Sequence, residues 1–209
     1  MTRAQSRQQT RQRLLAAAAE LFAEQGVNGA SVEQIAERAG YSRGAFYSNF
    51  EHKDELILAL LEQRTLREVE EVRALRQGAG SFGEVLERLR ALNIARSRHL
   101  ESWLALRLEL ILHALRTPHL RPLLADRELI ARRAIAAGIE HELRQAGAVP
   151  PADTAFLALI VHALEDGLLI QRQLTPDAIS EPVVVDAVAL LMRAWAAFGR
   201  PVDGSAETS

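Results

Sequence analysis

Residues 40–44 read Gly-Tyr-Ser-Arg-Gly and match the Gly-x-Ser-x-Gly pattern that surrounds the nucleophilic serine of many hydrolases. In those enzymes the serine stands on a sharp turn that follows a β-strand and precedes a helix. The residues before Gly40 have helical spacing, so the strand that the motif needs is not predicted here. We therefore expect no nucleophile at Ser42 and assign both glycines to a turn between helices.

Other residues that could support catalysis or bind a metal are also poorly placed. Residues 78–83 match Gly-x-Gly-x-x-Gly, but no apolar strand leads into them, and we interpret the stretch as a hinge. None of the six histidines stands in an HExxH pattern, and the chain has no cysteine. Glu165 and Asp166 are adjacent, so on a helix they diverge by about 100°. We expect no catalytic residue, no metal and no cofactor.

Composition and charge favour a globular protein with a basic N-terminal segment. Hydrophobic residues make up 48% of the 209 residues, charged residues 25%, and the formal net charge is −2. Residues 1–13 nevertheless carry four arginines and no acid, which predicts either a solvated disordered arm or a basic arm that binds DNA phosphates. No signal peptide or long uncharged span is predicted, so we expect a cytoplasmic protein without a membrane segment.

Helical periodicity runs through the chain and predicts an all-α protein of about nine helices. A first amphipathic helix ends at Gly26, and the Gly-Ala-Gly stretch at 78–80 is the clearest break. Serine caps are predicted at Ser31, Ser42 and Ser81, with capping boxes completed by Gln34 and Glu84. Later helices are expected at about 82–146, with interruptions near His99, Pro118 and Pro122, and then at 153–173 and 180–198.

The stretch 31–50 predicts two short helices that meet at a tight turn, with a left-handed backbone at Gly40. Phe46 and Phe50 would form the inner face of the second helix. Its outer face would fit a DNA major groove, where Arg43 could read guanine and Asn49 could read adenine or contact a phosphate. Lys53 is placed to hold the DNA backbone. A generic helical hairpin with a polar surface is the alternative.

This region resembles the N-terminal domain of the tetracycline-repressor family, the TetR/AcrR-type regulators. The similarity runs from Thr10 through Ala19-Glu20-Leu21-Phe22, Gly26 and Ser31 to Lys53 and Leu56, and Tyr41 stands where a small aliphatic residue is more usual. The resemblance implies that the second helix enters the major groove. It also implies base or phosphate contacts from Ser42, Arg43, Gly44, Ala45, Tyr47, Ser48 and Asn49, and DNA-backbone contacts from Ser31 and Lys53.

The last two predicted helices carry apolar stripes that could form a dimer interface or the core of the chain itself. One short DNA-reading helix contacts few base pairs, so a specific site normally needs two copies at half-sites about 34–36 Å apart. The family resemblance implies that these helices build a four-helix bundle between two copies. The residues predicted at the interface are Leu164, Gly167, Leu168, Val188, Leu191 and Trp195.

The middle helices resemble the family's effector-binding core by position only. The segment 101–115 is apolar nearly all round and is interrupted by Trp103, Arg107, Glu109 and His113. These four could line a pocket for a small molecule. Pairing among themselves is the simpler expectation, because Glu109 and His113 stand four residues apart on one helix.

These patterns together predict a helix-turn-helix DNA-binding domain at 8–68, with the motif itself at 31–50, and a larger helical effector-binding and dimerisation domain at 81–199. The expected function is a homodimeric, ligand-responsive transcriptional regulator, a repressor that a small-molecule effector releases from double-stranded operator DNA. The sequence does not distinguish an activator from a repressor. An all-helical enzyme or ligand carrier with an incidental hairpin is the competing class, and an architectural DNA-binding protein without effector is a third.

Overall fold

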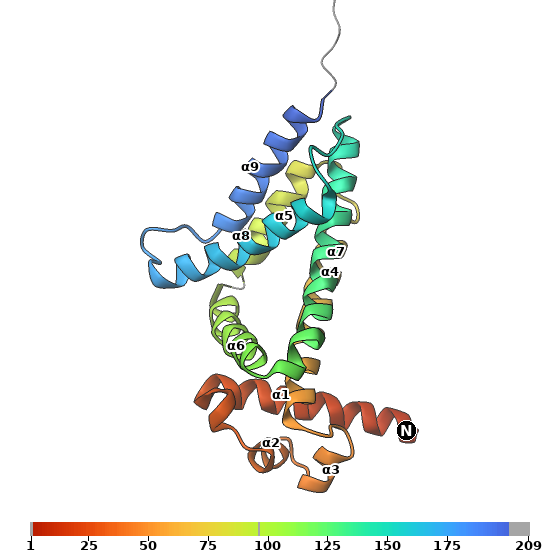
Figure 1. The fold of residues 1–209 in the computed structure, drawn as a ribbon, viewed down its shortest axis with the longest axis vertical. Coiled ribbons are helices and arrows are strands. Elements are labelled where there is room, and N and C mark those ends of the chain that lie inside the picture. The colour runs from red at the N-terminus through yellow and green to blue at the C-terminus, as the bar shows by residue number, and fades with distance from the viewer. Residues whose placement is uncertain (1, 96, 201–209) are drawn as a thin grey trace, which may run out of the picture. The chain divides into compact units, whose positions relative to one another are not determined.

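The computed structural model describes residues 2–95 and 97–200, and this part of the chain is helical with no β-strand. Its elements follow one another along the chain as Figure 1 shows. They are α1 (Arg3–Gly29), α2 (Val32–Arg38), α3 (Arg43–Tyr47), α4 (Lys53–Arg76), α5 (Phe82–Ala95), α6 (Ser97–Arg116), a 3-10 turn (Pro118–Leu120), α7 (Arg121–Gln145), α8 (Thr154–Leu174) and α9 (Val183–Phe198). The all-α prediction is confirmed.

The predicted helix boundaries near the N-terminus follow from local chemistry. Gly26 has φ +75° and interrupts the helical conformation of α1, as expected for a glycine stop. Ser31 caps α2 and forms the complete capping box with Gln34, whose side chain accepts from the Ser31 N–H at 2.8 Å. Gly40 has φ +78° between α2 and α3. The turn therefore takes the left-handed conformation that the sequence predicted.

The residues form two compact units, one of Met1–Glu68 with Arg98–Glu128 and one of Val69–Ser97 with Leu129–Ser209. The first unit buries one apolar core that joins α1, α2, α3 and the start of α4 to α6. Its completely buried members include Leu14, Phe46, Leu56 and Leu110. The unit thus extends beyond the predicted segment 8–68, because α6 completes its core.

The second unit packs α7, α8 and α9 around a separate core that contains Leu143, Leu157, Val161, Met192 and Trp195. A close backbone contact holds the end of α9. Val149 donates its N–H to the Gly199 carbonyl at 2.9 Å, and a Cβ at position 199 would overlap the Val149 carbonyl oxygen. Glycine is therefore required there by close packing of two backbones.

Two predicted boundaries differ from the structure. Helix α6 begins at Ser97 and runs without interruption across His99, so the predicted break does not fall at that residue. Residue 96, between α5 and α6, lies outside the described residues. The Ser81–Glu84 box is only half formed, because Glu84 Oε2 accepts from the N–H of Gly80 instead of Ser81, at 2.9 Å.

Candidate nucleic-acid interface

Helix α3 is a five-residue helix placed by its cap and by two buried rings. The Ser42 hydroxyl accepts from the backbone N–H of Ala45 at 3.2 Å and caps the first turn. Phe46 and Phe50 are buried and lie 5.6 Å apart between ring centroids, inside the core of the first unit. Because these rings anchor one side of so short a helix, its other side is held outward.

The outward side of α3 is polar and open. Ser42, Arg43, Gly44, Tyr47 and Ser48 are exposed. Ala45, which lies between this side and α1, is half-buried. An exposed hydrogen-bonding face with small residues at two positions has the composition that direct contact with base edges and phosphates requires.

Arg43 is held in place by two neighbours. Its Nη1 lies 2.8 Å from the Glu33 carboxylate on α2, and its Nη2 lies 3.5 Å from the Tyr47 hydroxyl, with the guanidinium 5.4 Å from the Tyr47 ring centroid. The contact with Tyr47 and then the charge of Glu33 raise the pKa of Arg43. A guanidinium has five donors, so others stay available for a guanine edge.

Asn49 differs from its prediction. The side chain is only 9% exposed, and its Nδ2 donates to the Ala45 carbonyl at 2.8 Å within the same turn. Its Oδ1 is buried without a hydrogen-bond partner among the described residues. Sequence reasoning placed Asn49 on the outer face, whereas it closes the last turn of α3 from within, so we withdraw it as a base-reading residue.

The arginines near the N-terminus belong to α1 and hold the end of α3. Arg7 Nη2 donates to the Ser48 carbonyl at 3.2 Å, and Arg11 Nη1 donates to the Asn49 carbonyl at 2.9 Å. Arg11 also stacks on the Phe50 ring at 4.1 Å. Carbonyls at a helix C-terminus lack intrahelical partners, which explains why cations stabilise this end. The sequence predicted the charge of this segment but gave no sign of these contacts.

Lys53 and Ser31 bracket the motif at its two ends. Lys53 Nζ donates to the carbonyls of Val27 at 2.8 Å and Ala30 at 3.0 Å, so the ammonium fastens the α1–α2 connection to the start of α4. Partial burial lowers the pKa of Lys53, and the Asp54 charge opposes that shift. Ser31 is exposed and used as a cap. Contacts of both residues with DNA stay predictions.

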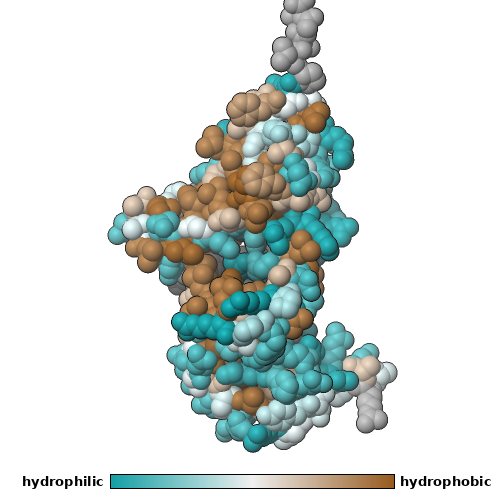
Figure 2. All heavy atoms as spheres, in the orientation of Figure 1, coloured by the Kyte–Doolittle hydropathy of each residue, from teal (hydrophilic) through white to brown (hydrophobic). Residues whose placement is uncertain are grey.

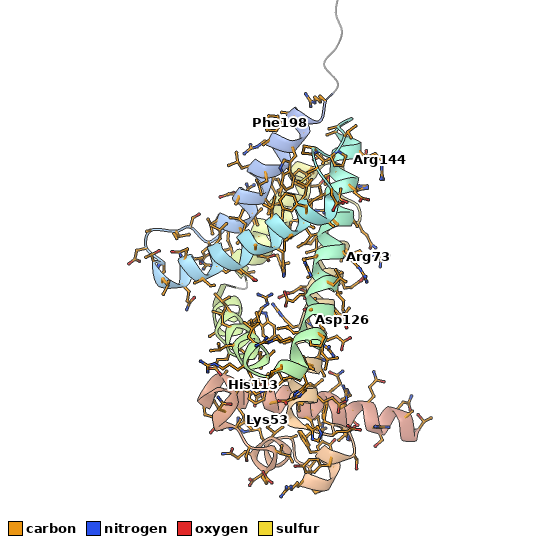
Figure 3. All side chains as sticks on the ribbon, in the orientation of Figure 1. Lys53, Arg73, His113, Asp126, Arg144 and Phe198 are labelled. Atoms are coloured by element: carbon orange, nitrogen blue, oxygen red, sulfur yellow. The ribbon has the colours of Figure 1, made fainter. Side chains whose placement is uncertain are left out.

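The four polar or aromatic residues of α6 contact other elements of their own unit. Glu109 Oε2 accepts from the Val27 N–H at 2.8 Å, and His113 Nε2 lies 2.8 Å from Asp54 Oδ1 at the start of α4 (Figure 3). Glu109 and His113 therefore do not pair with each other, and that expectation was wrong because partners on α1 and α4 are nearer. Arg107 pairs with Glu128 at 3.0 Å, and Trp103 lies under the Arg64 guanidinium.

The predicted dimer residues divide into two groups. Trp195 is only 8% exposed and belongs to the core of its own chain, and half-buried Val188 and Leu191 pack against that core. Leu164 and Leu168 are also half-buried, whereas a Cβ at Gly167 would meet nothing within 4 Å. Trp195 is therefore corrected to a core residue.

A second set of apolar residues on the same two helices is exposed, and sequence reasoning did not select it. Phe156 and Leu159 on α8 are 54% and 42% exposed, and Leu190 and Phe198 on α9 are 62% and 80% exposed. Figure 2 shows hydrophobic side chains gathered over this part of the second unit. Apolar residues occupy both the inner and the outer side of α8, so the sequence alone did not separate the two.

Neither a metal site nor a membrane span has strong support in the described residues. Within the described ranges, no group of three or more His, Cys, Asp or Glu residues could hold a metal ion. Helix α8 is long and apolar enough to cross a membrane by length and composition alone. One such helix is weak support for a membrane span, because core helices of globular proteins pass the same test.

Two known protein families match this chain. Residues 14–60 match the family described as bacterial regulatory proteins, tetR family, and residues 77–197 match the tetracyclin repressor-like C-terminal domain. The second match covers 121 of the 209 residues, which is more than half of the chain. The first match contains all nine predicted DNA-contact positions.

Similar proteins agree with these matches over part or most of the chain. The HTH-type transcriptional regulator SrpR of Pseudomonas putida is 47% identical over 57 residues, 27% of each chain. The repressor AcnR of Corynebacterium efficiens is 31% identical over 126 residues, 60% of this chain and 62% of AcnR. Both alignments thus span less than two thirds of the relative. A Rhodococcus sp. structure described as a TetR-family regulator covers 90% of this chain and 98% of its own, with a TM-score of 0.74 and 23% identity, and shows the same fold.

Proposed function

Because the chain belongs to the tetR family of bacterial regulatory proteins, we propose that it is a homodimeric repressor whose operator binding is controlled by a small molecule. The observation that carries the proposal is the outer face of α3, where Arg43, Tyr47 and Ser48 are exposed while Phe46 and Phe50 are buried. This helix reads the major groove of double-stranded operator DNA. Operator DNA lies in the bacterial cytoplasm, which is where the protein works.

The outer side of α3, which we call the reading face, consists of Ser42, Arg43, Gly44, Tyr47 and Ser48 with Ala45 at its edge. These residues take different parts in binding. Arg43 donates to a guanine edge, Tyr47 donates to a phosphate or base next to it, and Ser48 contacts the DNA beside them. Gly44 and Ala45 allow the helix to approach the groove closely. Ser31, Ser42 and Lys53 lie at helix starts beside the motif and contact the DNA backbone. Asn49 supports the helix from inside.

A second copy of the chain covers the exposed apolar residues of α8 and α9. Phe156, Leu159, Leu190 and Phe198 give these helices an outer face that is costly to leave in water. Gly167 has open space beside it, so another helix can approach closely there. Dimerisation through this face explains why α8 carries exposed as well as buried apolar residues, and it brings the second reading helix that an operator with two half-sites requires.

Effector binding is transmitted through α6. Its Glu109 holds the backbone where α1 ends, and its His113 holds Asp54 where α4 begins. A small molecule that displaces α6 would therefore pull on both elements that carry α2 and α3. A coupling free energy of about 1–3 kcal/mol, typical of allosteric proteins, lowers operator affinity about 5- to 150-fold.

Binding to DNA tests the proposal directly. Duplexes that the native protein selects from a random-sequence pool serve as the operator, and affinity is measured by fluorescence anisotropy. We expect Arg43→Ala to weaken binding to the selected duplex by about 5- to 150-fold, the cost of one bidentate base contact, and to relax the preference at one base position.

Arg133→Ala is the matched control, because Arg133 is an exposed arginine of α7 outside the reading face. Its removal changes the net charge equally and should leave selectivity unaltered. A native protein that selects no sequence, or an Arg43→Ala protein with native affinity and preference, would contradict the proposed function.

A further inference from the structure

An open groove of about 700 Å³ lies between the first turns of α1 and the helix α3. Small or hydroxyl-bearing side chains, one arginine and one asparagine line it, and these are Ala4, Ser6, Arg7, Thr10, Ala45, Ser48 and Asn49. Ala45 and Ser48 also border the reading face of α3. The groove is therefore continuous with the surface that we assign to DNA.

Two groups in the groove can donate hydrogen bonds to a ligand. Arg7 is exposed, and among its contacts with the described residues only the bond from Nη2 to the Ser48 carbonyl is formed. The fork of the guanidinium therefore keeps free donors. The Ser6 side chain is also exposed. The hydroxyls of Thr10 and Ser48 are already used, because they donate to the carbonyls of Ser6 and Gly44.

The charge around the groove indicates an anionic occupant. Residues 1–13 carry four arginines and no acid. Arg11 is bound within the protein, because it donates to the Asn49 carbonyl and lies 3.7 Å from the Glu55 carboxylate. Arg7, one turn earlier in α1, is exposed to solvent. Arginine and serine are residue types that proteins use on phosphate oxygens, and small neighbours allow the sugar to come close.

We propose that this groove binds the sugar-phosphate backbone of DNA beside the base pairs that α3 reads. The Arg7 guanidinium and the Ser6 hydroxyl donate to phosphate oxygens, so α1 extends the footprint of the protein beyond the helix-turn-helix. The proposal rests on the proposed function, since it concerns the same DNA. A contact of this kind adds affinity and salt dependence without adding sequence preference.

The first test removes the charge of Arg7 in the full-length protein. We expect Arg7→Gln to bind both the selected duplex and a random duplex about tenfold more weakly, the effect of one charged hydrogen bond. The slope of log affinity against log salt, measured between 50 and 200 mM, should fall by about 0.9. Arg13→Gln is the control, because Arg13 is exposed on another side of α1, and its slope should change little.

Arg7 also bonds the end of α3, so a second pair of variants avoids that contact. Ser6→Glu places a negative charge in the groove, and Gln8→Glu places the same charge on the opposite side of the same turn. We expect Ser6→Glu to weaken binding to both duplexes several-fold more than Gln8→Glu does, because only Glu at position 6 faces the phosphates.

The outcomes separate this inference from the proposed function. Suppose that Arg43→Ala relaxes the sequence preference while Arg7→Gln and Arg13→Gln have equal salt slopes. The groove proposal is then overturned, and the proposed role of α3 in reading DNA is retained. A loss confined to the selected duplex, with an unchanged slope, would make Arg7 a positioning residue and would likewise overturn it. Equal effects of Ser6→Glu and Gln8→Glu would do the same.

Discussion

Two exposed faces of this protein are built in opposite ways. The face of α3 is polar and stands on a helix of five residues, whereas the face of α8 and α9 is apolar and stands on helices of 21 and 16 residues. Side-chain contacts to carbonyls place the first face, through Arg7, Arg11 and Lys53. An apolar core and one close backbone contact, Gly199 to Val149, place the second.

The difference indicates what each face binds. A polar face loses little when it stays hydrated, so it can meet DNA through direct and water-mediated contacts. An apolar face gains free energy only when water leaves it, which requires a large complementary surface such as a second copy of the same helices. Under the proposed function, the polar face therefore meets a reversible partner and the apolar face a lasting one.

The largest expected effect comes from a charge on the apolar face. Leu159→Glu places a carboxylate on the outer side of α8, where Leu159 is 42% exposed, and burying that charge in a dimer would cost several kcal/mol. We expect a monomer in sedimentation equilibrium at micromolar concentration and a more than 100-fold loss of affinity for an operator with two half-sites, because only one reading helix remains per molecule.

Leu66→Glu is the control for that change. Leu66 is 49% exposed on α4, outside both α8 and α9, so the same substitution should leave the dimer intact. If Leu159→Glu stayed dimeric, the assignment of the outer face of α8 as the dimer interface would fail. The apolar face would then have no assigned partner.

The next largest effect concerns how α9 is placed. Gly199→Ala adds a Cβ where it would overlap the Val149 carbonyl oxygen, a backbone atom that cannot move without shifting the α7–α8 connection. We expect the free energy of unfolding to fall by about 2–3 kcal/mol, the upper range for overpacking, as measured by urea denaturation.

Gly83→Ala provides the matched comparison in α5. A Cβ there meets only the Ser81 hydroxyl oxygen at 3.8 Å, an ordinary contact, so the change should be neutral or stabilising by up to about 1 kcal/mol. Equal stabilities for the two variants would mean that the contact between α9 and Val149 does not hold the second unit together.

The residues of these two faces also show how far sequence reasoning reaches. The caps at Ser31 and Ser42, the stop at Gly26 and the turn at Gly40 were predicted and confirmed, because each depends on a few neighbouring residues and their backbone angles. The inward placement of Phe46 and Phe50 followed from helical spacing in the same way.

What the sequence did not predict depends on partners that are distant along the chain. Glu109 reaches Val27, 82 positions away, and Arg11 of α1 reaches the Asn49 carbonyl, 38 positions away. On α9 both Trp195 and Phe198 fit an apolar stripe, and only the packing of α7 and α8 decides that Trp195 is buried while Phe198 is 80% exposed. Local patterns carry no information about such choices.

A smaller effect is expected from Glu33, which neutralises the arginine of the polar face. The Glu33–Arg43 pair is more than half exposed on both sides, so it contributes at most about 1 kcal/mol. On random DNA Arg43 must leave Glu33 to reach a phosphate, and Glu33 itself repels the backbone. We expect Glu33→Gln to bind random duplex about threefold more tightly and the selected duplex with less gain, so the specificity ratio falls.

Glu37→Gln is the control on the same helix, since Glu37 is exposed and forms no contact with Arg43 among the described residues. Anisotropy titrations of all three proteins on both duplexes give the ratio directly. Equal changes for the two variants would reduce Glu33 to a general negative charge and remove its part in selectivity.

The smallest effect is a titration shift at Lys53, the single lysine of the chain. Its ammonium is fixed on the carbonyls of Val27 and Ala30, and partial burial lowers its pKa below the usual 10.5. Because the folded protein then binds this proton less tightly than the unfolded chain, stability from this group increases as pH rises through the folded pKa towards 10.5. Reductive ¹³C-methylation gives one side-chain amine signal whose pH titration reports the value.

The same signal tests the predicted contact between Lys53 and the DNA backbone. A phosphate beside the ammonium favours the charged form, so the pKa of Lys53 should rise when the selected duplex is added. An unchanged pKa in the complex would leave Lys53 as a strut that fastens α4 to the α1–α2 connection. The polar face would then be positioned by lysine and read by arginine, and its affinity for phosphates would have to come from α1 and α3 alone.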